Sequence, residues 1–188
     1  MTATKASKEL LQLVTFKLGD EEYAVDILKV QEVNRMVDIT AVPNSIHYLE
    51  GVINLRGRVI PVINLRKKFG LDVKTLDTQS RIMVVDVGIT IGIIVDSVSE
   101  VLRISHDTVE PPPPMAGGSE SEYIKGIGKL QDRLLILLDI DKLLKGSTKD
   151  EFTLLEVHDA NGPHRAAGVL AVQDKVVDIS SPRSSTYL

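Results

Sequence analysis

The sequence of 188 residues contains no cysteine and no tryptophan, and aromatic residues make up only 4% of it. The lack of cysteine excludes disulfides, thiolate metal sites and cysteine nucleophiles. So few aromatic side chains provide little surface on which nucleic-acid bases could stack. The net charge of −4 also has the wrong sign for a protein that binds phosphate backbones. We therefore expect no nucleic-acid partner.

Long hydrophobic runs are also missing. The longest, such as 134–138, have the length of a β-strand and fall far short of the roughly 20 residues that span a bilayer. The first eight residues are polar and do not resemble a signal peptide. Since 43% of the residues are hydrophobic and 26% are charged, the composition is typical of a soluble globular protein. We expect a cytoplasmic protein without direct membrane insertion.

Residue types that carry out catalysis do not form a recognisable motif. The four histidines include one loose pair near the C-terminus, which is weak support for a metal site. The segment 126–128 begins like a phosphate-binding loop, but the third glycine is missing and strand-like sequence follows. Asp139 and Asp141 stand where a helix is expected to start, and N-capping explains them. We predict no enzymatic activity, no catalytic residue, no metal and no cofactor.

The chain is rich in short β-branched and alternating segments, which predict β-strands. The segment 13–18 is followed by a turn of glycine and acidic residues and then by 23–25, as in a hairpin. The same pattern returns at 82–87 and 91–95, with Gly88 between them.

Two longer stretches also resemble each other at a constant offset of 75 residues. Four identical pairs occur when 51–70 is laid over 126–145: Gly51/Gly126, Leu55/Leu130, Arg58/Arg133 and Lys67/Lys142. Earlier in each half, 30–33 (VQEV) resembles 98–101 (VSEV). Strands can resemble one another by chance, but the two pairs of segments recur in the same order. We interpret the pattern as an internal duplication.

Each half supplies about five short strands, which favours an all-β fold of two packed five-stranded barrels, closed or nearly closed, because closure hides the sheet edges. The first barrel is expected at about 10–74 and the second at about 80–146. Short helices are expected at 65–70 and 140–146, where lysine and glycine provide stop signals. Four consecutive prolines at 111–114 predict an exposed, rigid loop.

The segment Asn54-Leu55-Arg56-Gly57-Arg58 indicates a tight turn that projects guanidinium groups. Arg56 either serves solubility alone or offers a rigid set of donors to a partner. Val30 and Glu32 leave a similar choice between simple burial and a groove where the barrels meet.

Four long segments in unbroken order resemble CheW, the chemotaxis coupling family. They are DEEYAVDILKVQEV (20–33), GVINLRGRVIPVINLRKKF (51–69), IGIIVDSVSEVL (91–102) and EYIKGIGKLQDRLLILLDIDKLL (122–144). The resemblance covers about 10–144. It implies two five-stranded barrels of Src-homology type.

The resemblance also implies a non-catalytic adaptor with two partners: the cytoplasmic tip of methyl-accepting chemotaxis receptors and the regulatory domain of the histidine kinase CheA. The implied receptor groove contains Val30, Glu32, Val33, Asn54, Arg56, Gly57 and Ile82. An adaptor in a receptor pathway other than motility is the alternative.

The C-terminal extension at 147–188 departs from the family pattern, which normally stops near Leu144. Apolar runs at 152–157 and 168–172 flank Asn161-Gly162, as in a hairpin. The extension could add an edge strand or remain loose, and 180–188 has the composition of a disordered segment.

Overall fold

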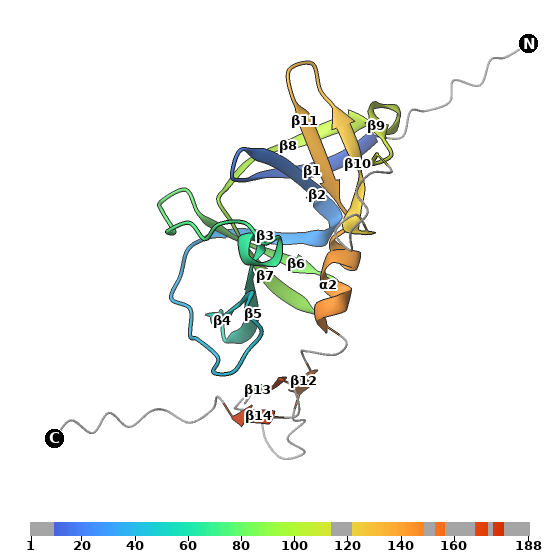
Figure 1. Cartoon of the computed structure of the whole chain (residues 1–188). Coiled ribbons are helices and arrows are strands. Elements are labelled where there is room, and N and C mark those ends of the chain that lie inside the picture. Colours follow the sequence, from blue (N-terminus) through green and yellow to red (C-terminus); the bar gives the residue numbers. More distant parts are fainter. Residues whose placement is uncertain (1–9, 114–121, 149–152, 157–167, 173–174, 179–188) are drawn as a thin grey trace, which may run out of the picture.

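A computed structural model describes residues 10–113, 122–148, 153–156, 168–172 and 175–178. Two large β-sheets occupy the upper and lower halves of the view in Figure 1. The last proline of 111–114, the Asn161-Gly162 pair and 180–188 lie outside the described residues.

The upper sheet has six strands in the order β8-β1-β2-β11-β10-β9. Its strands are β1 (Leu10–Leu18), β2 (Glu21–Asp26), β8 (Ser97–Ser105), β9 (Val109–Glu110), β10 (Ile124–Lys129) and β11 (Leu134–Leu138). All pairings are antiparallel except that of β2 with β11.

The lower sheet has five strands in the order β3-β6-β7-β5-β4. Its strands are β3 (Val30–Arg35), β4 (Leu49–Leu55), β5 (Arg58–Asn64), β6 (Arg81–Asp86) and β7 (Thr90–Val95). Here β5 and β7 form the parallel pair, so the two sheets are built alike. Short 3-10 helices precede β3 (η1, Ile27–Lys29) and β9 (η2, His106–Thr108).

The two halves of the duplication exchange their first hairpins. The hairpin β1–β2 joins β8 and β11 of the second half, and the hairpin β6–β7 joins β3 and β5 of the first half. The expected division into 10–74 and 80–146 therefore does not separate the two sheets. A repeated pattern shows that two units are alike, but it does not show which copy of a hairpin pairs with which copy of its neighbours.

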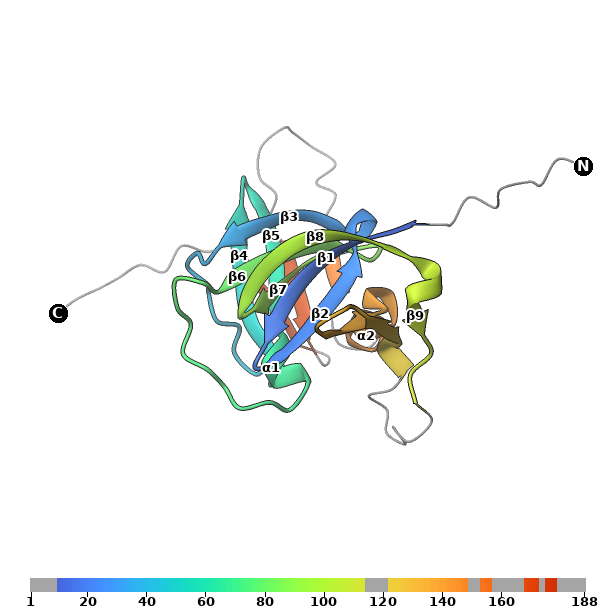
Figure 2. The ribbon, with the colours of Figure 1, turned by 90° about the horizontal axis from the view of Figure 1, so that it is seen from above.

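The all-β class and the pair of sheets are confirmed, but the sheets are not closed barrels. Each sheet curls, as Figure 2 shows, but its two end strands form no hydrogen-bond ladder with each other. Each sheet surrounds its own apolar interior: Ile53, Ile60, Val62, Ile82, Val84 and Ile94 in the lower sheet, and Leu13, Ala24, Ile104, Leu135 and Leu137 in the upper one.

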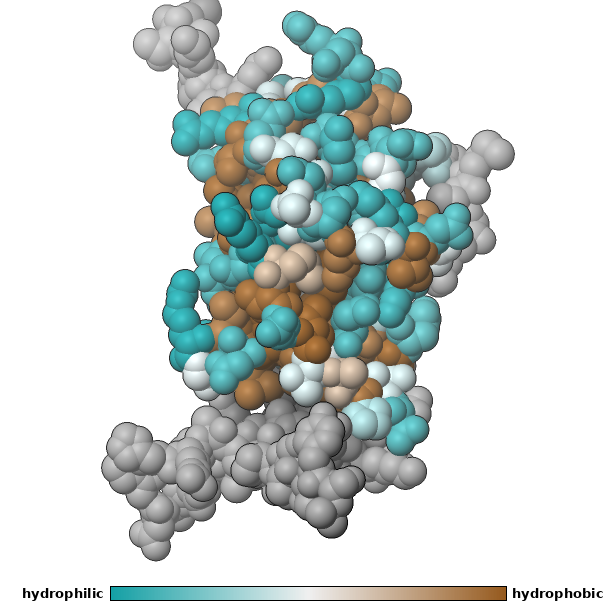
Figure 3. Space-filling view, turned by 90° about the vertical axis from the view of Figure 1, so that its left-hand side faces the viewer, coloured by the Kyte–Doolittle hydropathy of each residue, from teal (hydrophilic) through white to brown (hydrophobic). Residues whose placement is uncertain are grey.

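A third, larger core lies between the sheets. Phe16 and Leu18 from β1 meet Met83 and Val85 from β6 and Ile93 from β7 there. Neighbouring residues of one strand thus enter different cores, which is why these strands have nearly continuous apolar sequence. Figure 3 shows apolar side chains gathered over the lower half of one face of the molecule.

The two helices close the seam between the sheets. Helix α1 (Leu65–Lys68) is capped by the Asn64 side chain, which accepts a hydrogen bond from the Lys67 amide (3.3 Å). Helix α2 (Ile140–Thr148) begins 75 residues later, and Asp139 accepts a hydrogen bond from the Lys142 amide at 3.0 Å. The capping role predicted for Asp139 is confirmed.

The C-terminal extension forms a three-stranded antiparallel sheet of its own: β12 (Thr153–Glu156), β13 (Gly168–Val172) and β14 (Lys175–Asp178). The described residues of these strands form no ladder with either large sheet. These described strands therefore do not extend either large sheet as edge strands.

Two equivalent glycines let a bulged strand pass close to a neighbouring segment. Gly51 lies at a bulge in β4 with φ of 150°, and a Cβ there would lie 2.2 Å from the carbonyl oxygen of Thr40. At Gly126, in the matching bulge of β10, a Cβ would lie 2.8 Å from the carbonyl oxygen of Glu110. Since both contacts involve backbone atoms, a larger residue would displace the neighbouring segment.

We predict that Gly51→Ala and Gly126→Ala each lower the free energy of unfolding by about 2 kcal/mol or more. Gly128→Ala is the matched control, because its Cβ would meet no atom closer than 3.4 Å, and it should change stability by less than about 1 kcal/mol. Urea unfolding of the three variants measures this. Equal losses at Gly126 and Gly128 would contradict the close-approach explanation.

A half-buried ion pair connects the two sheets. Arg66 of α1 donates to Asp96 through Nε (2.8 Å) and Nη2 (2.6 Å), and both side chains are 15% exposed. The Gly19 amide, in the β1–β2 turn of the upper sheet, donates to the same carboxylate at 2.8 Å. Hydrogen bonding from Arg66 lowers the pKa of Asp96, against the opposing effect of burial.

A depressed carboxyl pKa gives stability that is complete above the unfolded pKa of about 3.9 and is lost as the pH falls through the folded pKa. We predict that Asp96→Asn costs about 2 kcal/mol at pH 7, where it leaves Arg66 without its partner. The difference from the parent protein should shrink as the pH falls below about 4. Urea titrations at pH 7 and pH 3 test this, and a difference independent of pH would refute it.

Candidate protein-binding surface

The turn between β4 and β5 has the geometry that its sequence predicts. Arg56 and Gly57 both have positive φ, 54° and 84°, as in a two-residue turn of type I′. The Asn54 side chain accepts a hydrogen bond from the Gly57 amide at 2.8 Å. Asn54 and Gly57 thus shape the turn, while the Arg56 side chain, 80% exposed, projects from it.

An ion pair links this turn to the opposite edge of the lower sheet. Arg56 Nη2 lies 3.0 Å from Glu32 Oε2, on β3. Since β3 and β4 are the two end strands of the sheet, the pair bridges its open side. The structure therefore brings together Arg56 and Glu32, two residues predicted for one site.

The upper sheet has a related bridge that is built from a different position, because Arg133 is the repeat equivalent of Arg58 and not of Arg56. Arg133 Nη2 lies 2.6 Å from Glu100 on β8, and Arg133 Nε lies 3.1 Å from the nearly buried Glu22. Glu100 is the repeat equivalent of Glu32. Arg133 is thus held by two carboxylates, whereas Arg56 is held by one and keeps most of its surface in solvent.

Strand β3 alternates between half-buried and exposed residues. Val30 packs against the core between the sheets, and Val98, its repeat equivalent at the start of β8, does the same. Val33 points outward and is 40% exposed. In Figure 2, β3 and β8 run along the same side of the molecule. This packing fits both alternatives left open for Val30, simple burial and a groove between the sheets.

Ile82 does not belong to this surface. Its side chain is 0% exposed and packs inside the lower sheet against Ile53 and Ile94. Including it in the predicted groove was wrong. Both faces of β6 are buried, so its apolar sequence gave no indication of which side chains reach solvent.

Val101 was missed by the sequence-based prediction. It is 55% exposed on β8 and is the repeat equivalent of Val33. The signal was present in the sequence, because the VQEV and VSEV segments align these two valines. Both valines are exposed, so neither belongs to a core, and they make β3 and β8 candidates for a contact surface.

Two kinds of functional feature, a cluster of metal ligands and a membrane-spanning helix, are absent from the described residues. No group of three or more histidine, aspartate or glutamate side chains in them is arranged to hold a metal ion. No helix of the described part is long and apolar enough to cross a bilayer. Paired charges and exposed valines on a rigid two-sheet frame define instead a protein-interaction domain.

The chain belongs to the CheW family: the CheW-like domain model matches residues 12–147. It is 38% identical over 158 residues to chemotaxis protein CheW of Klebsiella aerogenes, covering 82% of this chain and 93% of the relative. It is 39% identical over 140 residues to chemotaxis protein CheW of Treponema pallidum, covering 72% and 82%.

Among solved structures, it resembles the scaffolding protein TtCheW from Thermoanaerobacter tengcongensis, with a TM-score of 0.67 and 38% identity. The match covers 73% of this chain and 94% of that one. The fold and these relatives give the chain the role of a chemotaxis adaptor.

Proposed function

We propose that the chain couples methyl-accepting chemoreceptors to the histidine kinase CheA in the cytoplasm, without catalytic activity of its own. Its family and its likeness to a scaffolding protein support this role. The observation that carries the proposal is the Arg56–Glu32 pair, which joins the β4–β5 turn to β3 next to the exposed Val33. Residues 10–146 form the functional unit, and 147–188 are an addition to it.

The receptor tip binds along β3 and β8 in this proposal. Val33 and Val101 lose their exposed surface against apolar residues of the receptor helices, at about 25 cal/mol per Å². Arg56 and Glu32 fix the register by charge-assisted hydrogen bonds. Asn54 and Gly57 fix the conformation of the turn, and Val30 packs β3 against the core between the sheets.

Reconstitution tests the whole proposal. The chain is mixed with a receptor cytoplasmic fragment and CheA, and co-sedimentation and ATP consumption are measured together. We expect the chain to bring both partners into the pellet and to make ATP consumption depend on the receptor. Co-sedimentation of neither partner would refute the coupling role, and ATP consumption by the chain alone would refute the lack of catalysis.

We predict that Arg56→Glu weakens receptor binding at least tenfold. The change places a carboxylate, next to that of Glu32, where the proposal needs a hydrogen-bond donor to the receptor. Thermal unfolding should remain nearly unchanged, since the side chain is mostly in solvent. Lys129→Glu, an exposed cation on β10, is the matched control and should bind normally. Unaltered pull-down of the receptor fragment by Arg56→Glu would exclude this turn from the interface.

We also predict that Val33→Lys and Val101→Lys each reduce receptor binding about tenfold while the protein stays folded. Val73→Lys serves as the control, because Val73 is an exposed valine in the loop after α1, away from β3 and β8. Fluorescence anisotropy of a labelled receptor fragment measures the affinities. If the Val73 variant loses as much affinity as the other two, general surface hydrophobicity explains the effect.

A further inference from the structure

Strands β3 and β8 carry the same exposed residues at repeat-equivalent positions. When VQEV is laid over VSEV, the strands continue as VQEVNR and VSEVLR. Arg35 and Arg103 are therefore repeat equivalents, and each follows its exposed valine, Val33 or Val101, by two residues. All four side chains are exposed, so burial does not explain why both strands present a valine and then an arginine. We call each of these combinations a valine–arginine stripe.

Both stripes lie on the face of their sheet that turns toward the core between the sheets. Val33 pairs with Met83 in the β3–β6 ladder, and Val101 pairs with Val14 in the β8–β1 ladder. Residues directly opposite each other in an antiparallel ladder share one face of the sheet. Since Met83 and Val14 belong to the core between the sheets, that core continues into an exposed valine on each end strand. Side chains two residues further along a strand lie on the same face, which places the arginines there too.

The two arginines add no ion pair to the described part of the fold. Neither Arg35 nor Arg103 forms a hydrogen bond or an ion pair through its side chain with another described residue. Arg35 stands opposite Arg81 in the β3–β6 ladder, and like charges at such positions are destabilising. Arg103 stands opposite the neutral Gln12. Both guanidinium groups are thus available to a carboxylate outside the chain.

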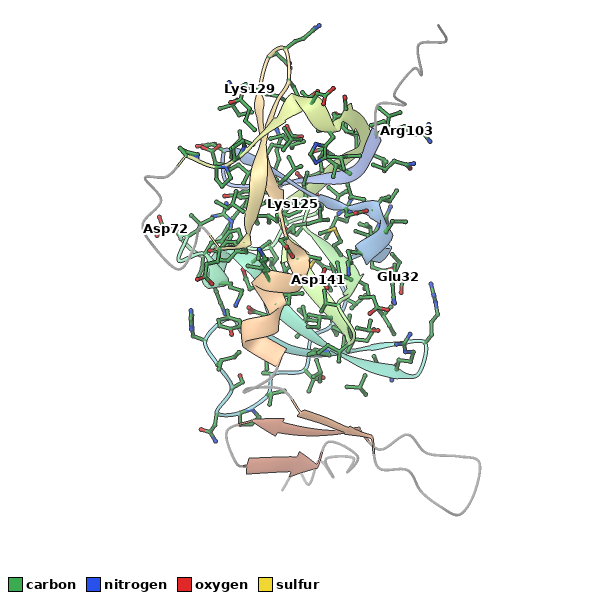
Figure 4. All side chains as sticks on the ribbon, turned by 90° about the vertical axis from the view of Figure 1, so that its right-hand side faces the viewer. Glu32, Asp72, Arg103, Lys125, Lys129 and Asp141 are labelled. Carbon is green, nitrogen blue, oxygen red and sulfur yellow. The ribbon has the colours of Figure 1, made fainter. Side chains whose placement is uncertain are left out.

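The two stripes point in opposite directions along one side of the molecule. Both strands begin where the chain crosses from one sheet to the other, so the valines lie nearer the seam than the arginines. In Figure 2, β3 and β8 run in opposite directions on this side. Figure 4 shows Arg103 and Glu32, from the two strands, at the same edge of the molecule. The surface therefore has an apolar centre and a cation toward either end.

A helix complements one valine–arginine stripe with two of its own side chains. Residues two apart in a strand are separated by about 7 Å. Residues three or four apart on a helix surface have Cβ atoms about 5–6 Å apart, and the long arginine side chain covers the difference. An aliphatic residue with a glutamate or aspartate one helical turn away therefore matches a stripe. Two stripes in opposite directions match two antiparallel helices.

We propose that Arg35 and Arg103 are charged anchors of the receptor surface and bind carboxylates on two antiparallel helices of the receptor tip. Each carboxylate lies one helical turn from an aliphatic residue that covers Val33 or Val101. The inference rests on the proposed receptor binding along β3 and β8, and it adds the chemistry that the partner must present. Hydrogen bonds between guanidinium and carboxylate groups are directional, so two of them fix the orientation of the helices.

Removal of the charge tests the anchors. Arg35→Gln and Arg103→Gln should each weaken binding of a labelled receptor cytoplasmic fragment about threefold, and the double variant about tenfold. The losses should shrink in about 1 M NaCl, where the Debye length is about 3 Å. Lys125→Gln is the matched control, because Lys125 is an exposed cation on β10 outside both stripes, and it should bind normally. Fluorescence anisotropy measures the Kd, and equal weakening by the Lys125 variant would refute the anchors.

Chemical restoration of the charge separates an anchor from a merely structural side chain. Because the chain has no cysteine, Arg35→Cys and Arg103→Cys each provide a single thiol for modification. An aminoethyl group attached through a disulfide restores a cation, whereas a sulfonatoethyl group adds an anion. After removal of the reagent, a fragment without cysteine is added. We expect the cation to recover most of the binding and the anion to weaken it further, to about tenfold below the parent protein. The same effect of both groups would overturn the proposal.

The outcomes also separate this inference from the coupling role. If the parent protein and all arginine variants bind the fragment equally well, the arginines are not anchors, and receptor binding itself stands. If the variants keep receptor binding but no longer co-sediment with CheA, the arginines serve the kinase, which overturns the assignment to the receptor. If the parent protein does not bind the fragment, the coupling role and this inference are both refuted.

Discussion

The apolar core between the two sheets is the constraint on which the rest of the structure depends. It takes side chains from β1, β2, β6 and β7, so each exchanged hairpin contributes both to a sheet and to the seam. A ladder of aromatic rings runs beside this core: Phe16, Tyr23, Phe69 and Tyr123 contact one another in turn at 5.4–5.9 Å between centroids. Deleting one large side chain from such a core typically costs 2–5 kcal/mol.

The seam also explains how a duplicated protein acquires different surfaces. Because the two sheets are fixed against each other, equivalent positions keep equivalent backbones while their side chains diverge. Arg133 is braced by Glu22 and Glu100, whereas its equivalent Arg58 donates to the Thr90 hydroxyl, and the neighbouring Arg56 pairs with Glu32 and stays accessible. An adaptor needs distinct surfaces, and divergence of repeats on one frame supplies them.

Much of the local structure was predictable from particular residues. The hairpins β1–β2 and β6–β7 follow from alternating segments around glycine turns, and the cap at Asp139 follows from its position before an amphipathic run. Asn54 and Gly57 indicated the tight turn that presents Arg56. The equivalence of Val33 and Val101 was also available, because VQEV and VSEV align, although only Val33 was predicted to belong to the site. Ile82 was misplaced because neither face of its strand is polar.

By itself, the sequence determined the strands, the turns, the caps and the existence of two similar units, since all of these depend on residues close together in the chain. Only the tertiary structure decided which hairpin joins which sheet, which apolar side chains face solvent, and that Arg56 meets Glu32 across an open edge. The physical reason is that hydrogen-bond ladders and apolar contacts are nearly the same for either copy of a repeated hairpin. The choice between the copies is made by packing across the seam, which joins residues distant in sequence.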